Sequence, residues 1–514
     1  MSVDSYATDG EQIMGHPKGL YVCFATEMWE RFSFYGMKYL LLLYLTKYHL
    51  FSDANGLNVL GSYAAMVYAM PVIGGLLADR YLGMRKAVLF GGTLLVLGHL
   101  GMAWEGHAAT EINGQIQRDQ TALQVFYFSL ALIVIGVGFL KPNISTIVGR
   151  LYAPEDTRRD AGFTIFYMGI NIGAFCATLL CGYLGETYGW KYGFGTAGLG
   201  MLIGLLTFIR GQKHLHGHAE PHDPASLKDK SIIGLSMEST IYLCGVLSVG
   251  IIWQMLQFHL VVASALDILS IIVLLGMTWF ITTQCTPDER DQMAVLIVLI
   301  ISTVVFWALF EQAAGSMTLY ADRVLNRESL GITWTAAQFG SLNALFIFTL
   351  APGFAWLWST LGKKGLEPST PVKFSLGIMQ AGLGFGALVV GASMPDESGK
   401  VAAYWMVLAY LLHTTGELCL SPVGLSAVTK LAVPRVVGVM MGAWFLAMAY
   451  SEYVAVQIAK FAAVDTHKGQ VTDIAQALAS YTNLFENLLY FGLGCGLLLL
   501  VISPILKKFM HGVH

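Results

Sequence analysis

The chain reads EMWERFSFYGMK over residues 27–38 and continues directly into the apolar segment YLLLLYL. A helix turns by about 100° per residue, so this stretch forms one charged and aromatic face within an arc of roughly 140°. That face carries Glu27, Glu30, Arg31, Phe34, Tyr35 and Lys38. Ionisable groups at membrane depth cost about 2.5–3.5 kcal/mol each on insertion scales and by default mark an ion or substrate pathway. The alternative is a helix end whose charges lie among the lipid head groups.

The composition assigns the chain to the polytopic helical membrane proteins. Of its 514 residues, 55% are hydrophobic and 12% are charged, about half the charged share of an average soluble domain. Its 30 basic and 33 acidic residues nearly balance, so we expect no nucleic-acid partner. The seven cysteines mostly lie in apolar runs, and their spacing suggests neither a metal site nor a disulfide framework. The polar first 19 residues indicate no cleaved signal peptide.

We predict fourteen apolar segments long enough to span a bilayer. They cover residues 19–46, 57–79, 86–105, 121–149, 161–184, 190–209, 239–262, 264–283, 292–320, 335–359, 373–393, 400–428, 436–461 and 482–506. Between the sixth and seventh lies GQKHLHGHAEPHDPASLKDKS, residues 211–231. This polar, proline-containing stretch predicts a solvated interdomain linker, and its four histidines leave a metal site as the alternative.

The basic residues orient the chain in the membrane. If the N-terminus is inside, most of the Lys and Arg residues fall in cytoplasmic loops and ends, as the positive-inside rule requires. We therefore expect both termini in the cytoplasm. The short loops and the helical insertion suggest a bacterial inner membrane, and the lipid bilayer is then an obligatory partner.

The loop GGLLADRYLGMRK, residues 74–86, resembles the signature that the major facilitator superfamily places between its second and third spans. The resemblance implies two six-helix bundles around a central cavity, with the seventh and eighth segments as an inserted pair. We therefore expect an N-terminal six-helix bundle over 1–210, a linker and inserted helix pair over 211–290, and a C-terminal six-helix bundle over 291–514.

Corresponding spans of the two halves carry charged or proline-interrupted segments. The ninth segment has Trp307 and Glu311 four residues apart, with Gln312 beside them. In the fourth segment Lys141 directly precedes Pro142, and in the twelfth Glu417 precedes Pro422 by about one turn. Such helices in two repeats are the best sequence indication of a midplane binding site. The alternative is that Lys141 and Glu417 form a structural ion pair without a transport role.

A narrower resemblance follows from several motifs together. EMWERFSFYG is similar to the E-x-x-E-R-F-x-Y-Y signature of the proton-dependent oligopeptide transporter family, and FTIFYMGINIGAF, residues 163–175, resembles that family's fifth-helix signature. FLKPN, SLNALF and GELCLSPVGLS resemble further family positions. Phe34 departs from the usual tyrosine, and Lys38 replaces the arginine of some relatives, losing a bidentate fork. The resemblance implies a proton-coupled symporter of di- and tripeptides that works by alternating access.

The charges predicted at membrane depth allow proton coupling. The predicted membrane-depth residues are four acids (Glu27, Glu30, Glu311 and Glu417) and three bases (Arg31, Lys38 and Lys141). If each base pairs with one acid, one carboxyl group has no basic partner. A carboxylate without a partner in a low dielectric is protonated more readily, so we expect protons as the coupling ion and no other cofactor. A zwitterionic peptide additionally needs a cation for its carboxylate and an anion for its amine, on opposite walls of a cavity.

These considerations predict a role for each residue. Glu27, Glu30, Arg31 and Glu311 form the proton-coupling group, with Glu30 as the first choice of proton carrier. Arg31 and Lys141 attract the substrate carboxylate, and Glu417 binds the amino terminus. The remaining substrate-binding predictions are Asn171 and Asn343 for the peptide backbone and Tyr35, Tyr68, Trp307 and Trp444 for side-chain pockets.

Some of these assignments have structural alternatives. Tyr68, Trp307 and Trp444 are equally explained by helix packing, and Asn171 and Asn343 by hydrogen bonds between helices. Lys38 and Asp322 each lie eleven residues beyond a charged anchor and are predicted as an outer gate pair, with an interfacial role as the alternative. His413 lies one turn before Glu417 and is expected to be a packed neutral histidine.

Two other functional classes are alternatives to a peptide transporter. A major facilitator carrier for another small solute, such as nitrate, would need the cations but not Glu417. An intramembrane enzyme would need a nucleophile–base pair or a metal cluster, and no such motif is present in the sequence. We therefore expect a transporter rather than an enzyme, working as a monomer.

Overall fold

The computed structural model describes the chain except for residues 1–11, 154, 222, 232–233, 330 and 513–514. Within the described residues it contains fourteen helices of 19 residues or more. They match the fourteen predicted apolar segments one for one. Eleven of them, with their short extensions, are long and apolar enough to be candidate membrane spans over the described part of the chain.

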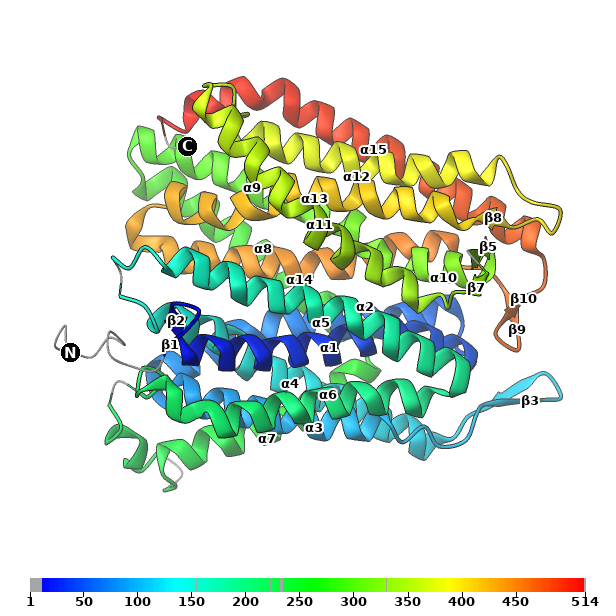
Figure 1. Ribbon diagram of the computed structural model, residues 1–514, viewed down its shortest axis with the longest axis horizontal. Coiled ribbons are helices and arrows are strands. Elements are labelled where there is room, and N and C mark those ends of the chain that lie inside the picture. The colour runs from blue at the N-terminus through cyan, green and yellow to red at the C-terminus, as the bar shows by residue number, and fades with distance from the viewer. Residues whose placement is uncertain (1–11, 154, 222, 232–233, 330, 513–514) are drawn as a thin grey trace. The chain divides into compact units, whose positions relative to one another are not determined.

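The elements follow one another as Figure 1 shows. The helices are α1 Lys18–Lys47, α2 Asp53–Leu77, α3 Met84–Met102, α4 Gln120–Arg150, α5 Arg159–Tyr188, α6 Trp190–Gly211, α7 Met237–Gln257, α8 His259–Gln284, α9 Pro287–Phe310, α10 Ser316–Arg323, α11 Ser341–Lys363, α12 Thr370–Ala392, α13 Ala403–Leu431, α14 Val437–Ala459 and α15 Ile474–Phe509. In the part of the chain that the structure describes, ten strands of two or three residues pair in the loops: β1 Gln12–Ile13, β2 His16–Pro17, β3 Thr110–Ile112, β4 Gln115–Gln117, β5 Leu325–Asn326, β6 Glu328–Ser329, β7 Ile332–Thr333, β8 Val401–Ala402, β9 Thr466–His467 and β10 Gln470–Val471.

The chain forms two compact units. The first comprises Met1–Leu41 and Met66–Phe258, and the second comprises Leu42–Ala65 and His259–His514. Helix α7 therefore belongs to the first unit and α8 to the second, so the predicted inserted pair is divided between the two. The domain boundaries at 1–210, 211–290 and 291–514 stay a prediction.

Glycines allow the helices of the first unit to approach closely. A Cβ atom on Gly91 of α3 would lie 2.5 Å from the carbonyl oxygen of Gly136 on α4. On α5, a Cβ on Gly173 would lie 2.2 Å from the carbonyl oxygen of Met28 on α1. Small residues make such backbone contacts possible in membrane helices. The close approach at Gly173 places α5 against α1 at the level of the charged face of α1.

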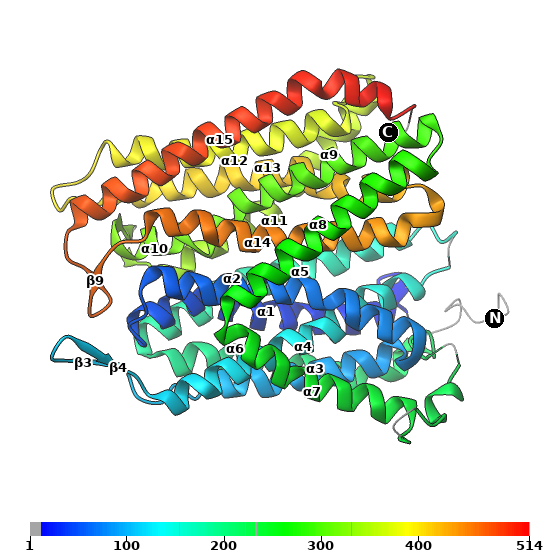
Figure 2. The ribbon, with the colours of Figure 1, turned by 180° about the vertical axis from the view of Figure 1, so that it is seen from behind.

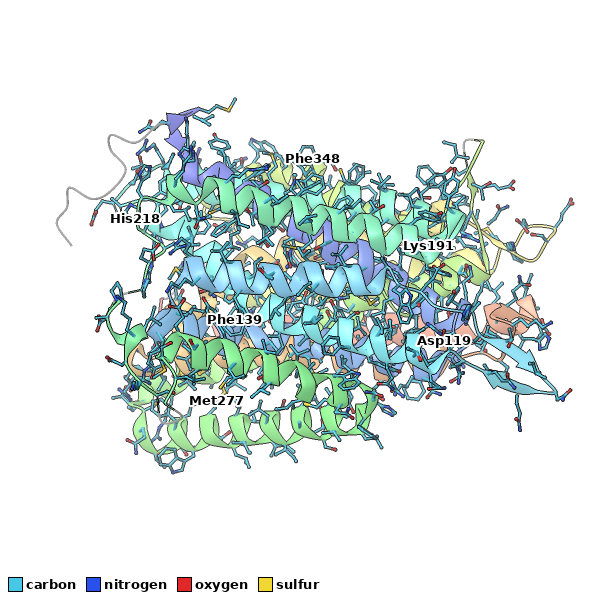
Figure 3. All side chains as sticks on the ribbon, turned by 90° about the horizontal axis from the view of Figure 1, so that it is seen from below. Asp119, Phe139, Lys191, His218, Met277 and Phe348 are labelled. Carbon is cyan, nitrogen blue, oxygen red and sulfur yellow. The ribbon has the colours of Figure 1, made fainter. Side chains whose placement is uncertain are left out.

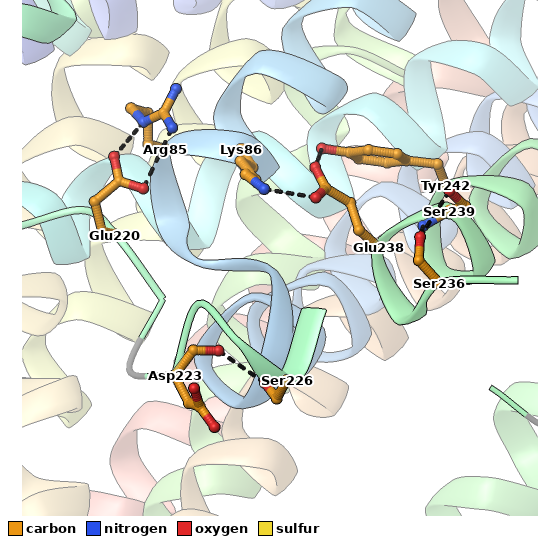
Figure 4. Close-up of polar contacts among 9 residues, drawn as sticks. All are labelled: Arg85, Lys86, Glu220, Asp223, Ser226, Ser236, Glu238, Ser239 and Tyr242. Carbon is orange, nitrogen blue, oxygen red and sulfur yellow. Dashed lines mark hydrogen bonds and ion pairs between the residues drawn. The ribbon is translucent and has the colours of Figure 1, made fainter. Parts of the chain in front are cut away.

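The linker packs on the first turn of α3. Glu220 forms an ion pair with Arg85, and Glu238 at the start of α7 lies 2.6 Å from the Nζ of Lys86 (Figure 4). The backbone N–H of Arg85 also donates to the carbonyl of Ala219 at 2.9 Å. Leu215, Ala219 and Leu227 of the linker are buried. The prediction of a wholly solvated linker was therefore wrong, because complementary charges and three small or apolar side chains attach it to the first unit.

In the second unit α12 lies beside α13 and α15, and α14 lies beside α8 and α9 (Figure 2). The segment predicted as one helix over 292–320 is interrupted. Helix α9 ends at Phe310, a 3-10 turn covers Glu311–Ala313, and α10 starts after Gly315, whose backbone angles of φ −103° and ψ −107° are not helical. The apolar composition predicted the span but not this break, which places Glu311 at the end of α9.

Capping side chains determine where several helices begin. Asp119 (labelled in Figure 3) accepts the N–H of Ala122 at 3.0 Å and starts α4. Hydrogen bonds from the N–H groups of Ala122 and His107 hold the pKa of Asp119 below its usual value. Thr286 and Glu289 form a capping box around Pro287 at the start of α9. Each of these capping interactions provides an acceptor for N–H groups that the first turn of a helix leaves without partners.

Candidate functional site

Helix α1 carries an ion-paired cluster in the first unit. The Nε of Arg31 lies 2.5 Å from Glu30 Oε2 and 3.2 Å from Glu27 Oε1. The exposed fractions are 3% for Glu27, 0% for Glu30 and 3% for Arg31, so the charges are not in a solvated helix end. Residues four apart on a helix face each other, which places Glu27 beside Arg31, and Glu30 reaches the same guanidinium from the adjacent position.

Aromatic rings separate this cluster from two lysines. The guanidinium of Arg31 lies 4.9 Å from the centre of the Phe34 ring, and Lys38 Nζ lies 5.9 Å from the same ring. Lys141 Nζ lies 4.5 Å and Lys38 Nζ 6.0 Å from the centre of the Tyr68 ring. All four distances are in the range of cation–π attraction. Phe34, which departs from the family signature, thus contacts two cations with its ring face although it lacks a hydroxyl.

The first unit brings together three of the predicted bases. Lys141 on α4 interacts electrostatically with Glu27, Glu30, Arg31 and Lys38 of α1. With both carboxylates ionised, the cluster has one cation more than it has anions. Among the described residues, Glu27 Oε2, Glu30 Oε1 and Arg31 Nη2 are buried without a hydrogen-bond partner. Buried polar atoms are normally paired, so this cluster has capacity for a proton and an anionic ligand.

Glu417 lies in a hydrogen-bonded chain in the second unit. Asn343 Nδ2 on α11 donates to Glu417 Oε2 at 2.8 Å and to Thr414 Oγ1 at 3.1 Å, both on α13. Thr414 in turn donates to the carbonyl of Tyr410 at 2.7 Å. Its single hydroxyl hydrogen is then used, so Thr414 must accept from Asn343. This chain determines which end of the Asn343 amide points to Glu417.

The acids of the second unit interact with each other. Glu311 and Glu417 repel electrostatically, although Glu311 lies in the 3-10 turn after α9 and Glu417 lies in α13. Two interacting carboxyl groups are not both ionised without cost. An ammonium group beside Glu417 would relieve that cost. Glu417 is 7% exposed, so water screens this repulsion only weakly.

The structure places the remaining predicted residues as follows. Trp307 packs edge-on against Phe306 and Phe310, Trp444 packs on Gly424, and Asn171 donates to the carbonyl of Tyr167 in its own helix at 3.0 Å. Tyr35 and Tyr68 are half-buried in the first unit. The packing alternative thus describes Trp307 and Trp444 well, and the substrate roles of all five stay predictions. Pro422 lies within α13, but its side chain is outside the described residues.

Asp322 has a partner that the sequence did not indicate. Lys47 Nζ lies 2.8 Å from Asp322 Oδ1 in the second unit, and the gate pair of Lys38 with Asp322 stays a prediction. His413 is buried against Phe385, with ring centres 4.7 Å apart, which agrees with the expected packed histidine. The Nε2 of Gln312 donates to the carbonyl of Ala455 on α14 at 2.8 Å.

Sequence reasoning missed a buried ion pair in the second unit. Arg323 on α10 binds Asp53 bidentately at 2.5 and 2.6 Å and also donates to the hydroxyl of Tyr481 at 2.9 Å. No spacing signal links these residues, because 270 positions separate Asp53 from Arg323. Thr414 was also missed, although its position three residues before Glu417 on a helix was a usable signal.

Comparison with known proteins yields matches over the whole chain. A model of the POT family matches residues 85–477. The peptide transporter YePEPT of Yersinia enterocolitica is 36% identical over 469 residues, 87% of this chain and 88% of the relative. A di-/tripeptide transporter of Lactococcus lactis is 32% identical over 523 residues, 97% of this chain and 98% of the relative. Among solved structures, peptide transporter POT in complex with sulfate is 36% identical with a TM-score of 0.83 and covers 100% of both chains. A mutant of peptide transporter POT in complex with alafosfalin is 37% identical with a TM-score of 0.82, covering 99% of this chain and 98% of the other.

Proposed function

This chain belongs to the POT family, the proton-dependent oligopeptide transporters, and on that premise we propose that it is a proton-coupled symporter of di- and tripeptides. It is a multi-pass membrane protein with an all-α fold of the major facilitator type. The relatives YePEPT and the Lactococcus lactis protein are named as peptide or di-/tripeptide transporters. These names favour a peptide over the alternative of nitrate.

The observation that carries the proposal is the opposite charge of the two clusters. The cluster of the first unit has one cation in excess, because Arg31, Lys38 and Lys141 lie near two carboxylates. In the second unit, the two acids Glu311 and Glu417 repel each other. A peptide zwitterion requires an attractive partner of each sign. A solute with a single negative charge would gain nothing from Glu417.

We assign the substrate carboxylate to Lys141 and Arg31 and the amino terminus to Glu417. Asn343 uses both hydrogens of its amide on Glu417 and Thr414, so it offers a peptide only its carbonyl oxygen. Tyr35, Tyr68, Trp307 and Trp444 contribute aromatic surface that accepts many side chains at low entropic cost.

The proton acts in the cluster of α1. When Glu30 is protonated, its bond to Arg31 is weakened, and Arg31 is released for the substrate carboxylate. We assign the shared proton to Glu30 first, with Glu27 and Glu311 as the other members of the coupling group. A proton moving inward through 100 mV supplies about 2.3 kcal/mol, which supports roughly fifty-fold accumulation at one-to-one coupling.

The cellular setting is part of the proposal. We place the protein in a bacterial inner membrane with both termini in the cytoplasm, as the distribution of basic residues favours. We propose a monomer as the functional form, because one chain supplies every charged group that the mechanism uses. A structure of the similar protein PepTSo2 is described as tetrameric, so the oligomeric state in membranes is the direct check.

The experiment that tests the proposal uses liposomes with a labelled dipeptide. Wild-type protein is compared with Glu30→Gln, and Glu328→Gln, at an exposed loop position, serves as the matched control. We expect Glu30→Gln to retain dipeptide exchange at equal pH and to lose accumulation driven by a pH gradient. Accumulation equal to that of Glu328→Gln would remove Glu30 from proton coupling.

A second arm tests the substrate class. Excess unlabelled dipeptide, nitrate or N-acetylated dipeptide is added to wild type and to Glu417→Gln. The proposal expects inhibition of wild-type exchange by the dipeptide but not by nitrate, and weak inhibition by the acetylated dipeptide, which has no cationic amine. If nitrate competes as well as the dipeptide, the peptide assignment is wrong.

A further inference from the structure

Three helices of the second unit enclose an apolar groove outside the proposed transport site. The groove has a volume of about 270 Å³ and is lined by side chains of α8, α9 and α14. Small residues of α14 leave the space, and larger aliphatic side chains form its walls. Representative lining residues are Leu274, Met277 (labelled in Figure 3), Ile301, Val305, Ala443 and Ala447.

Helix α8 makes this groove accessible to lipid. Among its described residues only Val262, Leu266 and Met277 are buried, and it is apolar enough to span a membrane. Aliphatic side chains along the rest of its surface are exposed, among them Ile271, Ile272 and Leu275. The surface beside the groove is therefore continuous with the surface that an acyl chain contacts.

A row of polar side chains leads to the groove along α14. Tyr450, Tyr453, Gln457 and Lys460 recur at intervals of three or four residues, so they share one face of the helix and the turn that follows it. Lys460 Nζ donates to Gln457 Oε1 at 2.9 Å. The lysine thus points back along the helix toward the groove instead of extending past the helix end. We call this row, with Asp267 of α8, the polar track.

The track also contains an acid at membrane depth. Asp267 lies eight residues into α8, about 12 Å from its start at 1.5 Å per residue. Tyr450 donates to its carboxylate at 3.2 Å, and Tyr453 lies close enough to interact with it. Acids within membrane helices are rare and usually functional. Nothing in the proposed peptide mechanism uses Asp267.

One lining group needs a further hydrogen-bond partner. The Oγ of Ser270, one turn deeper than Asp267, is buried and has no partner among the described residues. Serine in a membrane helix usually donates to a backbone carbonyl one turn earlier. A hydroxyl donor at the mouth of the groove would suit an ester carbonyl of a bound lipid.

We propose that the groove and the polar track form a binding site for an amine-bearing zwitterionic phospholipid of the phosphatidylethanolamine type. Lys460 receives the phosphate, Asp267 receives the ammonium group, and an acyl chain occupies the groove. The track carries one cation and one anion, which complement the two charges of this head group. A purely anionic phospholipid has no ammonium group and would leave Asp267 without a cationic partner, and a choline head group offers no N–H donor to its carboxylate.

The site is tested by lipid binding to purified full-length protein, measured by native mass spectrometry. Palmitoyl-oleoyl phosphatidylethanolamine, phosphatidylcholine and phosphatidylglycerol are added separately to delipidated protein in detergent. We expect phosphatidylethanolamine to bind at least tenfold more tightly than the other two at one saturable site. Equal binding of all three lipids would overturn the head-group assignment and with it the proposal.

Variants separate the groove from the rest of the lipid-facing surface. Ala447→Phe fills the groove and is expected to weaken phosphatidylethanolamine binding more than tenfold, whereas Leu247→Phe on the exposed face of α7 should leave it unchanged. Asp267→Asn should abolish the preference over phosphatidylcholine. Lys460→Gln should weaken binding about tenfold, and Lys468→Gln in an exposed loop is its control.

Two further outcomes decide against the site. If Ala447→Phe and Leu247→Phe bind phosphatidylethanolamine equally, the groove is not the place of binding. If Ala447→Phe instead abolishes a dimer of the protein without changing lipid binding, the groove contacts a second copy of the chain and the lipid proposal fails. Should Ala447→Phe not fold, Ala443→Val tests the same groove with a smaller addition.

Discussion

The contact between Gly173 and α1 predicts that one added methyl group will disturb the charged cluster. In Gly173→Ala, the new Cβ would lie 2.2 Å from the carbonyl oxygen of Met28 and 3.1 Å from the N of Phe32. Both atoms belong to the backbone of α1, so no side-chain rotation relieves the contact. Reaching 3.4 Å, where ordinary van der Waals contact begins, requires α1 and α5 to separate by about 1.2 Å.

This displacement has a stability cost and a functional cost. Overpacking of this kind destabilises by about 1–3 kcal/mol, offset in part by the roughly 1 kcal/mol that alanine gains over glycine in a helix. Met28 lies between Glu27 and the pair formed by Glu30 and Arg31, so α1 carries the whole cluster with it. A shift of about 1 Å at a functional site can cost about 100-fold in rate, and we expect a loss of that order in pH-driven uptake.

The assay combines thermal unfolding in detergent with dipeptide uptake in proteoliposomes. Gly250→Ala is the matched control, because it adds the same methyl group to a helix of the same unit where nothing lies within 4 Å. We expect Gly250→Ala to have unchanged uptake and an equal or slightly higher Tm. If Gly173→Ala behaves like Gly250→Ala, the close approach of α1 to α5 does not position the cluster and the reasoning is refuted.

Three further predictions concern single interactions. Thr414→Val removes the acceptor that orients the Asn343 amide, so the KM for dipeptide exchange should rise about fivefold, in line with about 1 kcal/mol per hydrogen bond. Thr414→Ser keeps the hydroxyl and should have the wild-type KM. Equal KM values for Thr414→Val and wild type would count against the orienting role. Asp53→Asn leaves the buried Arg323 without its ionic partner and should lower the free energy of unfolding by about 3–5 kcal/mol, whereas Asp53→Asn combined with Arg323→Gln should cost less than the sum of the two single changes. Hydrogen bonds from Ser398 and Lys400 lower the pKa of Asp396 to about 2, below its unfolded value of about 3.9. The carboxylate therefore stabilises the fold above pH 4, and the Tm difference between wild type and Asp396→Asn should shrink as the pH falls from 4 toward 2; a difference that persists at pH 2 would contradict this cause.

The sequence alone determined the fourteen long helices and many of the residues that carry charge within them, although Asp267 of α8 was not among the predicted acids. A segment in a bilayer must satisfy its backbone hydrogen bonds internally, so apolar length is enough to predict a helix without knowing its neighbours. The motif around Glu27, Glu30 and Arg31 was readable for the same reason, since their contacts arise within one helix at spacings of one and four residues. Most of the observed helix boundaries lie within a few residues of the predicted ones.

Only the tertiary structure decided the contacts between distant segments. The attachment of Glu220 to Arg85, the division of the inserted pair between two units and the bond from Asn343 to Glu417 each join residues on different elements. Composition and periodicity report the environment that a segment prefers, but they do not report which neighbour provides it. That choice depends on close packing and on charge pairing summed over the whole chain, which are established only when the helices have assembled.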